Sequence, residues 1–323
     1  MHPWLEENLV CPRDHLNLEL KTDALICKKG HSYPYIDDIP IMLLEEAKLI
    51  HSSLRKNIGQ LLSQVTQDYL LSKNGIDPYV QEAIASTCGL MYKGLINKIR
   101  GYPIPDLQLP KMQGMRFLDI GCNWGRWCIS AARKGCKCIG IDPALDAIKA
   151  ARRIARQMEL PNIYLVADAR YLPFRPESFD IVFSYSVLQH FDKEQAKLSL
   201  DEIGRILKNK GVSLIQMPNC FGIRNLYHQA RRGFKEPQAL SFDVRYWLPQ
   251  EMKRVFSDSI GRTSLSIDGF FSLNAQKNNS EFLPLRYRIL VNCSGMLKKA
   301  SEYIPFLVYL ADSIYIDSIK EKI

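Results

Sequence analysis

Between residues 116 and 217, short apolar runs alternate with longer stretches in which apolar residues recur every three or four positions. The short runs predict β-strands, and the periodic stretches predict amphipathic helices. The expected strands lie at 116–120, 136–142, 163–167, 179–184 and 212–217, and the expected helices at 125–134, 145–158 and 193–207. Such regular alternation indicates an α/β fold, with a parallel sheet covered by helices on both faces.

The chain before residue 116 has a different pattern. Residues 9–44 are short apolar pieces punctuated by Pro34 and Pro40, which predicts a small β-rich module over residues 1–44, separate from the main sheet. Residues 45–110 show helical spacing and end near Pro103 and Pro105, where a helix cannot continue. We therefore expect a helical linker over 45–110 and the main domain over 111–323.

Composition narrows the class of protein without identifying it. Of 323 residues, 46% are hydrophobic and 24% are charged, which is typical of a globular protein. A net charge of +9 favours anionic partners such as nucleic acid, phosphorylated sugars or a membrane surface. Nine scattered cysteines favour reduced thiols or metal ligands over disulfides. No apolar run resembles a signal peptide or reaches the roughly 20 residues of a spanning helix, so we expect a cytoplasmic protein without a transmembrane segment.

A glycine-rich turn follows the first expected strand, where Asp119, Gly121 and Gly125 have the spacing D-x-G-x-x-x-G. In an open α/β sheet, ligands bind beyond the carboxyl ends of the strands, and glycine lets the backbone approach them closely. A dinucleotide enzyme would have G-x-G-x-x-G there, to hold a pyrophosphate. A carboxylate beside the turn would repel that pyrophosphate, but it suits the amino group or the sulfonium of S-adenosylmethionine.

The segment from Leu118 to Gly125 resembles the first motif of class I S-adenosylmethionine-dependent methyltransferases, D-I-G-C-G-x-G, with Asn123 in place of the middle glycine. Asparagine tolerates left-handed backbone angles, so the turn can survive this change. The resemblance implies a Rossmann-like fold, S-adenosylmethionine as cofactor, Asp142 as acceptor for the ribose hydroxyls and Asp168 as acceptor for the adenine amino group. The candidate cofactor residues are Asp119, Gly121, Asn123, Trp124, Gly125, Asp142, Pro143, Asp168, Ala169, Ser184 and Tyr185.

The fourth expected strand leads into Tyr185-Ser186-Val187-Leu188-Gln189-His190, which resembles the type 11 branch of the family. Neither Asn-Pro-Pro-Tyr nor Asp-Pro-Pro-Tyr follows this strand, which argues against the amine-methylating nucleic-acid branch without excluding RNA. Methyl transfer from a sulfonium requires mainly alignment in a dry pocket. If the acceptor is a hydroxyl, His190 is the candidate catalytic base; alternatively, it begins or caps the next helix.

The N-terminal module contains two copies of Cys-x3-His, formed by Cys11 with His15 and by Cys27 with His31. Two thiolates and two imidazoles are enough for a tetrahedral zinc site. The surrounding sequence resembles the zinc-ribbon-like domain of tRNA-methyltransferase activators, although Asp14 stands where the second cysteine of the usual Cys-Pro-x-Cys would be. A metal-free ribbon held by apolar packing remains an alternative.

The tail after residue 220 is basic and aromatic, with eight Lys and Arg against four Asp and Glu between residues 223 and 262. In the family this region commonly covers the active site, so we expect an insert over about 220–262 that selects a phosphorylated, saccharide or nucleic-acid acceptor. Residues 263–268 and 314–318 predict the antiparallel hairpin that closes the fold. The basic and apolar stretch between them is compatible with a helix lying on an anionic membrane. In related enzymes the helices before residue 110 cover the cofactor, where Tyr92 would stack or hydrogen-bond unless it is simply half-buried.

The leading hypothesis is a methyltransferase that uses S-adenosylmethionine and acts on a small molecule or a lipid-linked saccharide. An RNA methyltransferase, a nicotinamide enzyme and a non-catalytic adaptor that binds a partner protein through the ribbon are the alternatives. Binding of S-adenosylmethionine would separate an enzyme from an adaptor, and steeply salt-dependent RNA retention would support the RNA hypothesis.

Overall fold

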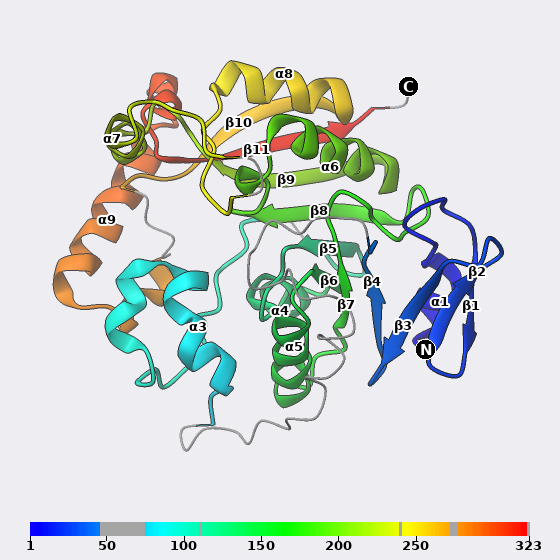
Figure 1. The fold of residues 1–323 in the computed structure, drawn as a ribbon. Coiled ribbons are helices and arrows are strands. Elements are labelled where there is room, and N and C mark those ends of the chain that lie inside the picture. The colour runs from blue at the N-terminus through cyan, green and yellow to red at the C-terminus, as the bar shows by residue number, and fades with distance from the viewer. Residues whose placement is uncertain (46–74, 110–111, 239–240, 272–276, 322–323) are drawn as a thin grey trace.

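A computed structural model of the chain describes residues 1–45, 75–109, 112–238, 241–271 and 277–321 (Figure 1). The strands are β1 Leu18–Lys21, β2 Ala24–Cys27, β3 Ser32–Ile36, β4 Ile39–Met42, β5 Arg116–Ile120, β6 Lys137–Asp142, β7 Ile163–Ala167, β8 Phe179–Tyr185, β9 Leu207–Pro218, β10 Gly261–Gly269 and β11 Ser313–Lys320. The helices are α1 Pro3–Asn8, α3 Pro78–Cys88, α4 Arg126–Arg133, α5 Leu145–Gln157, α6 Lys193–Ile206, α7 Ile223–Arg231, α8 Pro249–Ser259 and α9 Leu285–Ala300. Short 3-10 helices are η2 Leu90–Leu95, η3 Leu188–His190, η4 Lys277–Phe282 and η5 Pro305–Tyr309.

The described strands form one sheet in the order β1-β2-β3-β4-β7-β6-β5-β8-β9-β11-β10. The strands from β7 to β9 are mutually parallel. At one end β11 runs antiparallel to β9, and β10 runs antiparallel to β11. The predicted α/β Rossmann-like sheet is therefore confirmed, and the antiparallel hairpin closes it as expected.

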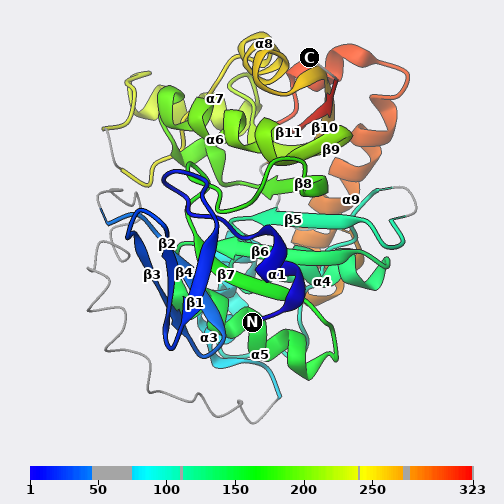
Figure 2. The same ribbon diagram turned by 90° about the vertical axis from the view of Figure 1, so that its right-hand side faces the viewer.

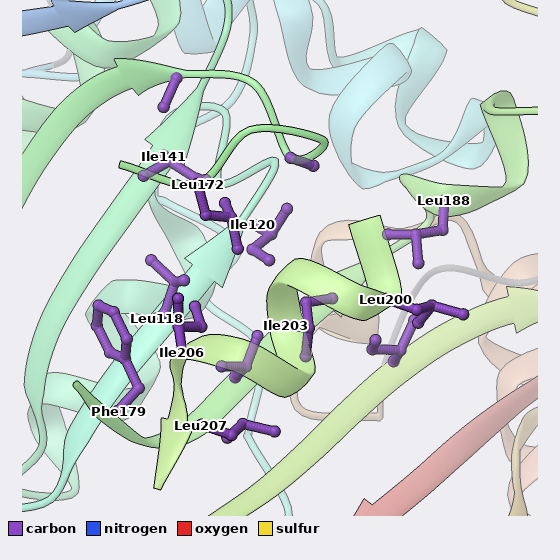
Figure 3. Packing of buried hydrophobic residues seen from close by; sticks show 14 of the residues in the cluster. Leu118, Ile120, Ile141, Leu172, Phe179, Leu188, Leu200, Ile203, Ile206 and Leu207 are labelled. Carbon is purple, nitrogen blue, oxygen red and sulfur yellow. The ribbon is translucent and has the colours of Figure 1, made fainter. Parts of the chain in front are cut away.

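Alternating residues of β5 enter two separate cores, one on each face of the sheet. Leu118 and Ile120 pack on the face covered by α6, where Ile203 and Ile206 lie (Figure 3). Phe117 points to the other face, where α4 and α5 cover the sheet. Apolar residues on both faces are what a parallel sheet between two helical layers requires.

The N-terminal module joins the main sheet, because β4 pairs in parallel with β7 through Ile41 opposite Val166 and Met42 opposite Ala167. Both views show the blue β1–β4 ribbon beside the β7 edge (Figure 1, Figure 2). The expectation of a separate unit was therefore wrong. An edge strand exposes unpaired backbone groups, and β4 satisfies those of β7.

Of the predicted helical linker, residues 46–74 lie outside the described part. The remainder forms α3 and η2, and α3 is tied to α5 by two hydrogen bonds from Arg153 to the buried carboxylate of Asp77, at 2.7 and 3.0 Å. Tyr92 is fully buried among apolar residues between α3 and the sheet domain. Its ring therefore packs in a core and does not line the cavity described below.

The predicted insert over 220–262 divides into two parts. Its second half, α8, packs against α6 and β10 through Met252 and Phe256, so it covers the sheet and not the site. The segment between α7 and α8 carries Phe242 to the cavity at the carboxyl ends of the strands. Within the described residues, no helix combines the length and apolarity needed to cross a bilayer.

Candidate cofactor and acceptor site

A cavity of about 610 Å³ lies at the carboxyl ends of β5, β6, β7 and β8, and residues of α3 and Phe242 also line it. Its position is the one expected for a ligand site in an open α/β sheet. The predicted site residues that line it are Gly121, Asn123, Trp124, Asp142, Pro143, Asp168, Ala169, Tyr185 and His190.

The turn between β5 and α4 approaches the cavity with three residues at positive φ. Gly121, Asn123 and Gly125 have φ values of 74°, 48° and 81°. A side chain at Gly121 would place its Cβ 2.3 Å from a methyl carbon of Val187, so no larger residue fits there. Asn123 adopts the left-handed angle expected of it, and its Oδ1 accepts a hydrogen bond from Trp124 N at 2.9 Å. Asparagine therefore keeps the turn that glycine forms in the family motif.

Asp142 ends β6 with both carboxylate oxygens already oriented by the backbone. Oδ2 accepts a hydrogen bond from Asn123 N at 3.0 Å, and Oδ1 accepts one from Ala144 N at 2.9 Å. Burial raises the pKa of Asp142 to about 6, although these two hydrogen bonds oppose the shift. The result is a fixed acceptor at the cavity wall that ionises near neutral pH.

Three of the predicted cofactor residues lie behind the wall of the cavity. Asp119 is 1% exposed and accepts a hydrogen bond from Cys128 Sγ at 3.5 Å. Burial raises its pKa to about 7, against the attraction of Arg126. Ser184 Oγ donates to Ile120 O at 3.1 Å, and Gly125 packs on Tyr164 at the start of α4. These three residues therefore support the glycine turn and the neighbouring strands and do not line the cavity.

Asp168 lines the cavity but shares its carboxylate with Arg170. Its Oδ1 accepts hydrogen bonds from Arg170 N at 2.9 Å and from Arg170 Nε at 3.0 Å. The guanidinium in turn lies 5.5 Å from the centre of the Phe191 ring. Oδ2 of Asp168 accepts two more hydrogen bonds, from Arg170 Nε at 3.2 Å and from Arg170 Nη2 at 2.5 Å, so any ligand amino group would share the acceptor oxygens of Asp168 with Arg170.

Several lining residues were missed from the sequence. Tyr79 and Thr87 reach the cavity from α3, and Trp124 Nε1 donates to Thr87 Oγ1 at 3.1 Å. No local motif marks these two, because only tertiary packing brings α3 to the site. Arg126 also lines the cavity, with its guanidinium 5.6 Å from the centre of the Tyr185 ring. Its place directly after the glycine turn was the available signal.

His190 ends η3, directly after β8, and is held by Phe242. Its ring stacks on the Phe242 ring with centroids 3.8 Å apart and an interplanar angle of 9°. Its Nδ1 lies 3.0 Å from the carbonyl oxygen of Phe242. A carbonyl only accepts, so Nδ1 carries the proton and Nε2 carries the lone pair of the neutral ring. The N-cap of α6 is Asp192, which accepts from Gln195 N at 2.8 Å, so His190 does not cap that helix.

The predicted zinc ligands are brought together with one exception. Cys11, Cys27 and His31 offer ligand atoms that lie within 4.8 Å of one another, and the fourth such residue is Asp14. His15 has a positive φ of 56° and directs its ring toward Glu202, with Nε2 and Oε2 3.7 Å apart. The prediction of His15 as a ligand was therefore wrong, because the turn after Cys11 directs the carboxylate inward and the imidazole outward.

Known proteins resemble the chain over its central part. The family described as "Methyltransferase domain" matches residues 117–211. The Ubiquinone biosynthesis O-methyltransferase of Bartonella quintana is 30% identical over 201 residues, which cover 57% of this chain and 75% of that protein. The Brucella ovis protein of the same name is 38% identical over 159 residues, which cover 45% of this chain and 59% of that protein. A solved S-adenosylmethionine-dependent methyltransferase of Methanosarcina mazei is 17% identical with a TM-score of 0.47, covering 67% of this chain and 99% of that one.

The chain belongs to the class I S-adenosylmethionine-dependent methyltransferases, and it is an enzyme of that class.

The raised pKa of Asp142 predicts a pH dependence of cofactor binding. If ribose hydroxyls donate to the ionised carboxylate, as the family resemblance implies, protonation should weaken binding of the cofactor as the pH falls through about 6. We expect the affinity for S-adenosylmethionine to fall by about tenfold per pH unit below that value. Calorimetric titrations between about pH 5 and pH 7 would measure this slope. In Asp142→Asn the affinity should be lower and independent of pH, and a slope that persisted in this variant would show that Asp142 is not the titrating group.

Proposed function

We propose that the protein transfers a methyl group from S-adenosylmethionine to a hydroxyl oxygen of a small, flat acceptor, with His190 as the catalytic base. The observation that carries this proposal is the pairing of His190 with Phe242. The Phe242 carbonyl holds the proton on Nδ1, so Nε2 is the basic nitrogen of a residue that lines the cavity. An imidazole in this tautomer accepts a hydroxyl proton near neutral pH.

The residues of the cavity fit S-adenosylmethionine by their chemistry. Asp142 would accept from the ribose hydroxyls and Asp168 from the adenine amino group, while Arg126 offers a positive charge to the methionine carboxylate. When bound, the cofactor supplies an activated methyl group on its sulfonium. The cavity would then align the acceptor oxygen with that methyl group.

Two features support a hydroxyl on an aromatic ring as the acceptor. The first is that the aromatic side chains of Tyr185, Trp127 and Phe242 line the same cavity as His190. Stacking against such side chains favours planar ligands. The second is that the relatives named above are O-methyltransferases of ubiquinone biosynthesis. An aromatic hydroxyl also loses its proton more readily than an aliphatic one.

Transfer of a labelled methyl group tests the proposal. The enzyme is incubated with S-adenosylmethionine that carries a deuterated methyl group, together with a panel of catechols and other phenols, and the products are analysed by mass spectrometry. We expect label on a phenolic oxygen. Label found only in RNA, in protein or on nitrogen would contradict the proposal.

We further propose that the module of residues 1–44 is stabilised by one zinc ion bound by Cys11, Asp14, Cys27 and His31. Zinc bonds of about 2.0 to 2.3 Å imply distances of about 3.3 to 3.8 Å between tetrahedral ligand atoms. His31 Nδ1 lies 3.5 Å from Cys11 Sγ, 3.4 Å from Cys27 Sγ and 3.3 Å from Asp14 Oδ2. Cys27 Sγ and Asp14 Oδ2 are 3.8 Å apart. These separations, and a donor set of two thiols, an imidazole and a carboxylate, fit zinc.

Elemental analysis of untagged protein, purified without added metal, is expected to find about one equivalent of zinc. Asp14→Ala should lose most of the metal and lower the melting temperature, whereas the matched control His15→Ala should keep the metal. Zinc retained by Asp14→Ala but lost from His15→Ala would contradict this ligand set. A folded wild-type protein without metal would contradict the site itself.

A further inference from the structure

Helix α9 exposes large apolar side chains on the face turned away from the protein. Leu285, Ile289 and Met296 are 70%, 54% and 71% exposed. They follow one another at spacings of four and seven residues, which places them on one stripe of a helix. Val291 and Ser294 on the opposite face are buried, and Ser294 Oγ accepts from Phe270 N at 2.9 Å. One face of the helix is therefore packed against the protein, and the other exposes apolar side chains to solvent.

Two further segments expose apolar side chains at the same end of the molecule. After α9, the side chains of Tyr303 and Phe306 are also largely exposed. Helix α7 is joined to the end of this segment by a hydrogen bond from Arg224 N to Asp312 Oδ1, at 2.8 Å. The side chains of Ile223 and Tyr227 on α7 are exposed. Both helices lie at the left-hand end of the molecule in Figure 1, on the same side as α3. No described part of the chain covers these side chains.

The charges around this surface are mainly positive, and the exposed Glu302 beside Tyr303 is an acidic exception. Helix α9 carries Arg286 and Arg288 in its first turn and Lys298 and Lys299 in its last, with no acidic residue between Leu285 and Ala300. Helix α7 likewise contains arginines and no acidic residue. Long basic side chains at both ends of an apolar stripe extend their charges to the level of lipid headgroups while their stems stay on apolar surface.

We infer that the outer faces of α7, α9 and η5 form a docking surface for an anionic phospholipid bilayer. Charge complementarity selects this occupant, because a second copy of the chain would bring the same basic residues together and repel them. Helix α9 has 16 residues and would lie in the headgroup region without crossing the bilayer.

The surface is connected to the cavity through hydrogen bonds. At the end of α7, Arg232 Nη2 donates to Val244 O at 2.9 Å. The adjacent Arg245 donates through Nη1 to His190 O at 2.6 Å. The segment that carries Phe242 is thus attached both to α7 and to His190. Docking would therefore hold the acceptor side of the cavity near the lipid surface, whichever atom is methylated.

Flotation of the full chain with lipid vesicles tests the inference without cofactor or acceptor, so its outcome is independent of the proposed methyl transfer. We expect the protein to float with vesicles of phosphatidylcholine mixed with phosphatidylglycerol. With vesicles of phosphatidylcholine alone, it should remain in the bottom fraction. Added salt should weaken binding by screening the basic residues.

Replacement of Leu285, Ile289 and Met296 together by serine should weaken vesicle binding by about tenfold or more, with no change in melting temperature. The matched control is Leu198→Ser, which removes an exposed leucine from α6 and should leave binding unchanged. The double variant Lys298→Glu, Lys299→Glu should also weaken binding to the anionic vesicles.

Absence of binding, equal binding to both kinds of vesicle, or full binding by the serine variant would overturn the inference. A wild-type dimer that the serine variant converts to a monomer in analytical ultracentrifugation would instead assign the surface to a second copy.

Discussion

Replacing Asp142 by alanine is expected to weaken binding of S-adenosylmethionine by about two to four orders of magnitude. The variant loses two hydrogen bonds from ribose hydroxyls to a carboxylate, each of which contributes about 1.5 to 3 kcal/mol. The carboxylate is oriented for this role by Asn123 N and Ala144 N, at 3.0 and 2.9 Å. Isothermal titration calorimetry measures the loss directly.

Two controls separate this effect from damage to the fold. Asp146→Ala removes an exposed carboxylate from the first turn of α5 and should leave the affinity unchanged. The melting temperature of Asp142→Ala without ligand shows whether the turn around Asn123 survives. An affinity equal to that of the wild type would refute the assignment of Asp142 to the ribose.

Replacing His190 by alanine is expected to lower turnover by about 10² to 10⁴, while the affinity for S-adenosylmethionine stays nearly constant. The variant loses the basic nitrogen that would take the acceptor proton, but Asp142 and Asp168 remain in place. Turnover with a phenolic acceptor and calorimetry with the cofactor are measured on the same preparation.

A pH–rate profile distinguishes a base from a structural histidine. In the wild type, kcat should rise as the pH increases through the pKa of His190, and this limb should disappear in His190→Ala. The matched control His228→Ala removes an exposed histidine from α7 and should keep the profile. Wild-type turnover in His190→Ala would mean that the enzyme works by alignment alone.

The strand–helix alternation and the glycine turn could be predicted because they depend on local sequence. The 3.6-residue period of α5 and the left-handed angle at Asn123 are properties of a few consecutive residues. The same holds for Asp142, which ends a strand whose neighbours all end at one edge of the sheet.

Features that depend on tertiary packing could not be predicted in this way. Nothing near Ile41 indicates that β4 pairs with β7, more than 120 residues later. The same is true of Thr87, which meets Trp124 only because α3 folds over α4 and α5. In the cluster of Cys11, Cys27 and His31, residue types suggested His15 as the fourth member, but Asp14 takes that place and His15 faces Glu202. The spacing of residues in the sequence indicates which side chains could lie close together. The backbone conformation of the turn then determines which of them do.

A crystal structure of the full chain with S-adenosylhomocysteine, the demethylated cofactor, tests the central claim most directly. The account predicts that the ligand fills the cavity between α3 and the carboxyl ends of β5 to β8. Its ribose hydroxyls should lie within hydrogen-bond distance of Asp142, its adenine should lie beside Asp168, and its sulfur should face the wall formed by His190 and Phe242. Ligand bound elsewhere, or bound in this cavity with the ribose away from Asp142 and the sulfur away from His190, would contradict it.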